Sequence, residues 1–277
     1  MKKLLILILG LFYFYIFAQE ETPKEFDLKY IYKKGDISSY RLKIENLEKL
    51  NISGKYSEKK GKIIIDFEEE VCEVDENNNG ILKLKFMEGS LNNIKIDISN
   101  KTATLKRNPK GKILESLGLE EISSEIVKII QKSLSEYILG IDRIPLSIDF
   151  SKFDSNTFNI YVQSFTPVFP EQKIKIGEKW EKQIMIPVFF TKGKLIYTFE
   201  KIEENKAYLI LNLEKDQIKG NGELIFDIEK GKIIEQNFTV KGENIKTKVD
   251  LSQYIPQYKQ SFEVLSSIIV KINLKGI

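Results

Sequence analysis

The stretch Phe169–Trp180, which reads FPEQKIKIGEKW, decides how the rest of the chain is interpreted. It contains the only tryptophan of the sequence, and its segment Lys175–Glu178 (KIGE) repeats in weaker form the earlier segment Lys33–Asp36 (KKGD). A glycine and an acidic residue between alternating apolar and polar residues are typical of a turn that joins two strands. The stretch therefore marks the start of a second copy of one β-rich unit.

Further landmarks follow these two turns in the same order. They are a strand, an acidic turn, a second strand and a later glycine turn: Ile63–Glu68, Asp75–Gly80, Ile81–Phe86 and Asn108–Ile113 in the first copy; Leu195–Glu200, Glu203–Lys206, Tyr208–Leu213 and Glu229–Ile233 in the second. We interpret them as an internal duplication with half-repeats of about 26–115 and 169–250. The alternative is convergence, because lysine-rich hairpins resemble one another.

Alternating residues between turn signals predict strands along most of the chain. Besides the landmarks, we expect them at Phe26–Tyr32, Ser39–Ile44, Gly61–Val74, Ile94–Ile98, Thr102–Leu105, Phe158–Val162 and, at the C-terminus, about 262–274. Hairpin after hairpin without a βαβ rhythm indicates an antiparallel sheet. Ten or more strands tend to curl or split. The predicted fold class is therefore mainly β (α+β), with one large curved antiparallel sheet or two related sheets.

One amphipathic helix is predicted at about 120–139. Its apolar residues recur at spacings of three, four and seven: Ile122, Ile126, Ile129, Ile130, Leu134, Tyr137 and Ile138. Gly140 suits its C-terminal end, and a proline-containing linker follows. The stripe must cover a sheet, either as ordinary core or as one wall of an apolar cavity.

The N-terminus has the pattern of a secretory signal. Met1–Lys3 is basic, Leu4–Phe17 is apolar apart from Gly10, and Ala18 precedes polar residues. We predict a signal peptide at 1–18 and a single β-rich domain at 19–277, exported to the periplasm or the cell exterior. An uncleaved membrane anchor is the alternative, although the apolar run is short for a span.

The charge composition argues against binding to nucleic acid. The sequence has 43 Lys and Arg against 40 Asp and Glu, and loss of Lys2 and Lys3 with the signal lowers the basic count to 41. A chain with so small a net charge has no overall field to attract a polyanion. Only three residues are arginines (Arg41, Arg107 and Arg143), and they are scattered. We expect no nucleic-acid partner.

The absence of histidine excludes the commonest catalytic base and metal ligand. The lone Cys72 lies in a strand pattern, which favours a buried free thiol over a nucleophile or an intermolecular bridge. Trp180 is expected to pack in the core or sheet, with a ligand cavity or a partner surface as the alternative. We assign no catalytic, metal or cofactor residue, no cofactor, and no ligand-binding residue.

Two acidic motifs have plain structural interpretations. Asp75–Gly80 matches the first half of a calcium loop, but the twelfth position, which requires a glutamate, is Phe86. A hairpin turn is favoured over an unusual calcium site. Glu68–Glu70 is expected on a solvated strand face, and a carboxylate pair of a glycosidase is the alternative.

Pro170 and the segment Lys173–Trp180 resemble a family of secreted bacterial proteins of unknown function. In that family a proline is followed, after a short gap, by Val-Lys-Val-Gly-Asp-x-Trp midway along a duplicated β-rich chain. Here isoleucine replaces valine, and Glu178 replaces the aspartate. The resemblance implies a relation to periplasmic lipoprotein-carrier folds, in which a curved sheet holds acyl chains against helices. It implies binding without catalysis and supplies no functional residues.

These observations favour an exported binding protein of the cell envelope that is not an enzyme. Its partner would be an apolar or lipid-like ligand held between curved sheet and helix. A structural or protein-interaction module that uses sheet edges is the alternative. A hydrolase that depends on carboxylates alone is a third hypothesis.

Overall fold

The computed structural model describes residues 24–52, 55–125, 162–164, 166–186, 191–250 and 261–277. These residues form the following strands: β1 (Glu25–Phe26), β2 (Ile37–Ile52), β3 (Lys55–Val74), β4 (Gly80–Leu91), β5 (Ile94–Lys95), β6 (Thr102–Arg107), β7 (Ile113–Leu117), β8 (Ile174–Lys175), β9 (Lys179–Ile186), β10 (Thr191–Glu203), β11 (Lys206–Lys215), β12 (Ile218–Asp227), β13 (Lys232–Asp250) and β14 (Ser261–Gly276).

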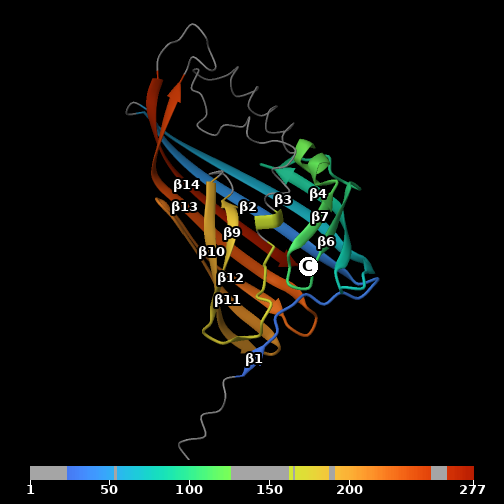
Figure 1. The fold of residues 1–277 in the computed structure, drawn as a ribbon. Helices are drawn as coiled ribbons and strands as arrows, with labels where there is room; N and C mark the ends of the chain where they lie inside the picture. The colour runs from blue at the N-terminus through green and yellow to red at the C-terminus, as the bar shows by residue number, and fades with distance from the viewer. Residues whose placement is uncertain (1–23, 53–54, 126–161, 165, 187–190, 251–260) are drawn as a thin grey trace, which may run out of the picture.

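Twelve of the strands make one antiparallel sheet (Figure 1). Its order is β7-β6-β4-β3-β2-β14-β13-β12-β11-β10-β9, with β5 paired to β4, while β1 and β8 form a separate two-stranded pair. The prediction of a mainly β protein with a large curved antiparallel sheet is confirmed, and the sheet is continuous. The longest strands (β2, β3, β13 and β14) lie near its centre.

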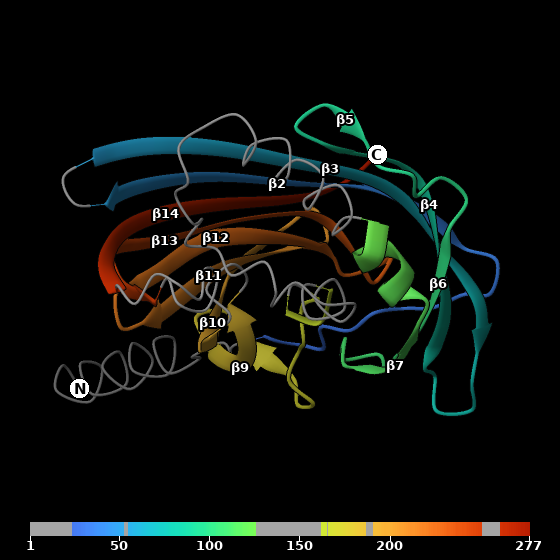
Figure 2. The same ribbon diagram turned by 90° about the horizontal axis from the view of Figure 1, so that it is seen from above.

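The sheet is curved into an arch, and its edge strands β7 and β9 turn toward the same side (Figure 2). Side chains alternate between the two faces, as the pleat requires. In β4, the inward residues Leu82, Leu84 and Phe86 are buried, while Lys83 and Lys85 are exposed. The same alternation runs along β11. The concave face is therefore the apolar one.

The turns that open β2 and β9 are built alike. Gly35 and Gly177 both have positive φ, +88° and +91°. Gly35 N donates to Val71 O (2.8 Å), and Val71 N donates to the carbonyl of the residue after the glycine (2.9 Å). Gly177 and Phe199 make the corresponding two bonds at 2.7 and 2.9 Å. This likeness agrees with the duplication, but the two-repeat organisation stays a prediction.

The predicted strand Phe26–Tyr32 is wrong beyond Phe26. Residues 27–32 form no ladder and instead connect the turns of both halves: Tyr30 N donates to Pro109 O (2.7 Å) and Ile31 N to Gly231 O (3.3 Å). Leu28 and Tyr30 are buried. Their alternation with polar residues reflects packing under the sheet and not pairing within it.

Two other predicted elements are corrected. Ile94–Ile98 is a strand only at Ile94 and Lys95, since Ile96 and Ile98 turn inward and are fully buried. Val162 is helical, within a short helical segment at 162–164, and not the end of a strand. The rest of Phe158–Val162 lies outside the described residues, as does the signal segment 1–18.

The predicted helix is described only over its first turns, residues 119–125. Ile122 and Leu119 are buried in the core beneath β4 and β6, so this part packs on the sheet as expected. Positions 126–139 lie outside the described residues.

The concave face has two large apolar cores with a small one between them. One, under β9–β13, is rich in aromatic residues and contains Phe169, Tyr197 and Phe226. The other lies under β3, β4 and β6. The small cluster (Ile44, Ile268, Val270 and Ile272) lies on β2 and β14, where the halves meet.

Candidate functional site: a pocket on the concave face

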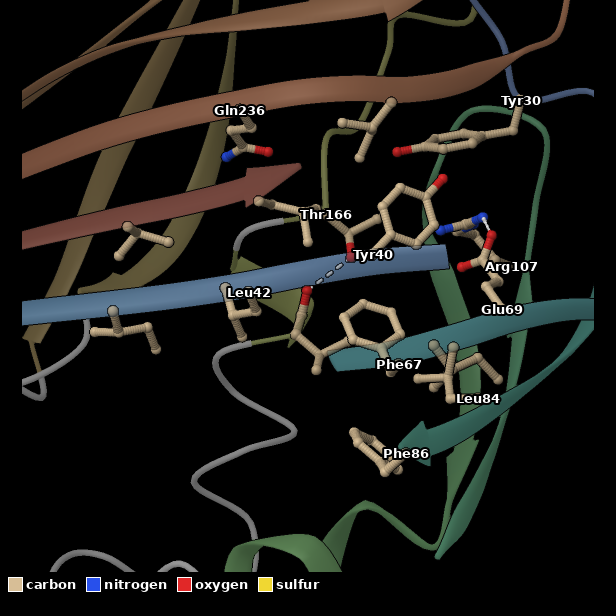
Figure 3. Close-up of a pocket in the computed structure, with 16 residues that line it drawn as sticks. Tyr30, Tyr40, Leu42, Phe67, Glu69, Leu84, Phe86, Arg107, Thr166 and Gln236 are labelled. Atoms are coloured by element: carbon tan, nitrogen blue, oxygen red, sulfur yellow. Dashed lines mark hydrogen bonds and ion pairs between the residues drawn. The ribbon is translucent and has the colours of Figure 1, made fainter. Parts of the chain in front are cut away.

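A partly open pocket of about 100 Å³ lies where the two halves of the sheet meet (Figure 3). Apolar side chains make up most of its lining: Leu42, Ile44, Phe67, Leu84, Phe86, Leu105, Val162, Ile233, Ile272 and Leu274. The polar members are Tyr30, Tyr40, Glu69, Arg107, Thr166 and Gln236. The described wall of the pocket is thus mostly apolar and contains a few polar groups.

The central strands form its floor, because their registers place apolar residues side by side. Leu42 of β2 pairs with Leu274 of β14, and two positions further along Ile44 pairs with Ile272. At about 3.3 Å per residue, the floor from Tyr40 to Ile44 measures roughly 13 Å along the strand. The pocket is therefore an elongated trough.

A buried ion pair lies at one end of the trough. Arg107 Nη2 donates to Glu69 Oε1 at 2.8 Å, and the two side chains are 8% and 14% exposed. Arg107 Nε donates to Tyr32 Oη (2.9 Å), which in turn donates to Asn108 O (3.1 Å). The guanidinium carbon also lies 4.1 Å from the centre of the Tyr30 ring.

This environment keeps Arg107 charged. Burial favours the neutral guanidine, but the charge of Glu69 and the hydroxyls of Tyr32 and Tyr30 raise the pKa of Arg107 well above its ordinary value. Among the described residues of the lining, Glu69 and Arg107 are the charged ones, and their charges cancel. This part of the pocket wall has no net charge.

The tyrosines of the pocket remain neutral. Burial raises the pKa of Tyr30 well above its ordinary value, and it also raises the pKa of Tyr40. Both hydroxyls thus remain able to donate and to accept hydrogen bonds.

Three buried polar atoms of the pocket lack a hydrogen-bond partner among the described residues. They are Nε2 and Oε1 of Gln236 and the hydroxyl oxygen of Tyr30, on side chains of residues only 2% and 3% exposed. Tyr197 Oη is also unpaired in that part of the chain but does not line the pocket. Each unpaired buried group costs about 1–3 kcal/mol, so a bound molecule that pairs with it gains that much.

The structure corrects the expectation for Glu68–Glu70. Glu69 faces the concave side and pairs with Arg107, while Glu70 is exposed. The sequence did not predict this pair, because 38 residues separate Glu69 and Arg107. Among the described residues of the lining Glu69 is the only carboxylate, so these residues do not supply the carboxylate pair of a glycosidase.

Trp180 packs in the core, as predicted. Its ring stacks on Tyr197 with centroids 5.2 Å apart, and Nε1 donates to Val168 O at 2.8 Å. It does not line the pocket. Cys72 is free, as expected, but only partly buried: the register of β3 with β4 skips it at a bulge. The expected buried thiol is therefore wrong.

Asp75–Gly80 forms the predicted hairpin turn between β3 and β4. The Asp75 carboxylate accepts from Asn77 N and Asn79 N, both at 2.9 Å, and pairs with Lys106 at 3.0 Å. Among the residues that the structure describes, no cluster of acidic or cysteine side chains is arranged to hold a metal ion. Within the same residues, no helix is long and apolar enough to cross a bilayer.

Fold and pocket together define a protein with a strongly curved antiparallel sheet and an apolar trough on its concave face. The chain belongs to DUF6263, a family of unknown function, whose model matches residues 49–253. This agrees with the part of the resemblance that named a family of unknown function. No curated protein matches the chain.

Two solved structures resemble it at low sequence identity. Lipovitellin, from a study of its lipid–protein interactions, aligns with a TM-score of 0.47 and 8% identity over 88% of this chain. The aligned part is only 25% of the lipovitellin chain. A DUF1329 family protein from Desulfovibrio piger aligns with a TM-score of 0.19 and 10% identity over 85% of each chain.

Proposed function

We propose that this protein is exported and binds an apolar, lipid-like ligand in the concave trough without catalysing a reaction on it. The composition of the lining supports this most directly: ten of its sixteen described residues are apolar, and three of the polar ones (Tyr30, Glu69 and Arg107) lie together at one end. This combination of apolar surface and a few oriented polar groups is typical of small-molecule sites.

The dimensions of the trough favour an aliphatic chain over a compact ring system. The floor is elongated along β2 and β14, and its volume of about 100 Å³ suits a short aliphatic segment. Because the trough is partly open, the remainder of a longer chain would extend out of it. The site would then bind one part of a lipid and leave the other accessible.

Export is the second part of the proposal. It depends on the N-terminal sequence pattern. N-terminal sequencing of protein recovered from the periplasm and the medium tests it. A new N-terminus at Gln19 is expected; protein that stays in the cytoplasm with Met1 intact would refute this part.

Binding is tested with the uncharged fluorescent probe N-phenyl-1-naphthylamine and by native mass spectrometry of gently extracted protein. Leu274→Trp places an indole in the trough and is expected to weaken probe binding about tenfold. The matched control is Leu117→Trp, because Leu117 is 70% exposed on the edge strand β7 and is not part of the lining.

Equal weakening by both variants, or none by either, would contradict binding in the trough. Wild-type protein that binds no probe, carries no small molecule and copurifies with a stable protein partner would instead support the structural or interaction module. Exposed Leu114 and Leu117 on β7 are the surface on which such a partner would then be sought.

A further inference from the structure

The unpaired polar atoms of the pocket belong to Gln236, on β13, and to Tyr30. Figure 3 shows the amide of Gln236, from β13, and the hydroxyl of Tyr30 directed into the space above β2. Within the described chain neither group has a hydrogen-bond partner, and both residues are almost fully buried. Together they present two amide N–H donors, one carbonyl acceptor and one hydroxyl that can do either.

The position of Gln236 shows that the fold itself does not need an amide there. Gln236 pairs with Leu224 on one side and with Leu274 on the other. The row continues across β2 and β3 through Leu42 and Ile65. A leucine would complete this apolar row. The buried amide of Gln236 destabilises the sheet, because no described neighbour hydrogen-bonds with it.

Arg107 is already paired with an anion. Its Nη2 and Nε atoms are engaged by Glu69 and by the Tyr32 hydroxyl, and Glu69 balances its charge. Arg107 is the only cation among the described residues of the lining, and Glu69 balances it, so a carboxylate or phosphate in this trough would have to lose its water close to the charge of Glu69. A cationic head group would have to lose its water close to the positive charge of the Arg107 guanidinium.

Resting on the proposed function, we propose that Gln236 and Tyr30 bind the head group of the ligand, and that this head group is uncharged and both donates and accepts hydrogen bonds. The ligand class is therefore a neutral amphiphile, such as a monoacylglycerol or a fatty alcohol. The aliphatic chain lies along Leu42, Leu274, Ile44 and Ile272, and the ion pair excludes charged lipids of the same chain length.

The test compares three probes with one chain length: monolauroylglycerol, laurate and lauryl acetate, which accepts but does not donate. Dissociation constants are measured by displacement of N-phenyl-1-naphthylamine from the full-length protein. Wild-type protein is expected to bind monolauroylglycerol about tenfold more tightly than either of the others, as one or two satisfied buried hydrogen bonds require.

Two variants locate this preference. Gln236→Leu is expected to abolish it, and Tyr30→Phe is expected to reduce it by a smaller factor. The control Asn237→Leu changes the neighbouring residue on the opposite, exposed face of β13 and is expected to keep the preference. Because leucine fits the apolar row, Gln236→Leu is expected to melt no lower than wild type.

Three results would overturn the inference: equal affinities for the three probes, tighter binding of laurate, or a preference that Gln236→Leu leaves unchanged. The last is expected if ordered water alone satisfies these atoms. Each of them leaves lipid binding in the trough intact. Failure of all three probes to bind the wild type would refute the proposed function instead, so the two failures are distinguishable.

Discussion

The two halves of the sheet carry different side chains at matched positions, counted from the glycine turns that open β2 and β9. In the second half, Trp180 is the third residue after the Gly177 turn, and it pairs across the strands with Tyr197 and stacks on it. In the first half, Ser38 is the third residue after the Gly35 turn, and it pairs across the strands with Glu69. One half thus has two large rings where the other has a small hydroxyl and a carboxylate.

This difference concerns the polar end of the pocket, which lies on the first half. The rings under β9–β13 fill their space, with Phe169 and Phe226 only 4.7 Å apart between centroids. At the corresponding place in the first half, Glu69 pairs with Arg107, and both residues line the pocket. At these matched positions the second half (the filled half) is closed by rings, and the first half (the hollow half) borders the pocket. An origin of the two halves by duplication stays a prediction.

The largest expected effect comes from breaking the ion pair of the hollow half. Arg107→Leu leaves Glu69 buried without a counter-charge and is expected to lower the free energy of unfolding by about 3–5 kcal/mol. Denaturation in urea measures it. Replacing both residues by leucine is expected to recover most of the loss, because no charge is then buried alone. A loss below about 1 kcal/mol in the single variant would show that Glu69 reaches solvent easily.

In the filled half, we expect the substitution of Trp180 to lower the free energy of unfolding by less than Arg107→Leu does. Trp180→Leu removes the stacking on Tyr197 and the hydrogen bond to Val168, and since the indole is only partly buried we expect a loss of about 2–3 kcal/mol. The counterpart change, Ser38→Ala, is expected to cost less than about 0.5 kcal/mol. Equal losses at the two positions would contradict the division into a filled and a hollow half.

The strands and turns could be predicted because they depend on local pattern. Period-two alternation revealed β4 and β11, and the glycine–acid pairs revealed the turns before β2 and β9. The same alternation contained a signal that was missed. Glu69 and Gln236 each occupy an inward-facing position between apolar residues of their strands, and Arg107 follows the inward-facing Ala103 and Leu105 at the end of β6. A polar residue at such a position is a candidate for a site.

The meeting of these residues could not be predicted from the sequence. Gln236 reaches the pocket because the C-terminal β14 inserts between β13 and β2 and joins the two halves into one sheet. Tyr30 reaches it because residues 27–32 run between the turns of both halves and do not pair as a strand. Both arrangements depend on long-range packing, for which no short sequence pattern exists.

The smallest expected effect concerns the short helical segment that helps to cover the trough. Lys182 Nζ, on β9 of the filled half, donates to the carbonyls of Gln163 (2.5 Å) and Thr166 (2.7 Å), and so holds the wall that contains Val162 against the sheet. Burial lowers the pKa of Lys182 to about 8. In the unfolded chain the lysine keeps its ordinary pKa of about 10.4.

Between pH 8 and 10 the unfolded chain therefore binds more protons at this position than the folded protein does. The contribution of Lys182 to the free energy of unfolding should therefore rise with pH across that window. We expect a rise of about 1–2 kcal/mol, because the exposed part of the side chain is screened by solvent and this reduces the full effect of the pKa shift. The measurement compares urea denaturation of the wild type and Lys182→Met at pH 7.5 and at pH 10. The difference between the two proteins should change in favour of the wild type at the higher pH. A difference in unfolding free energy that stays constant with pH would contradict this prediction. It would mean that the carbonyls of the helical segment stabilise the charged amine of Lys182 enough to offset its burial.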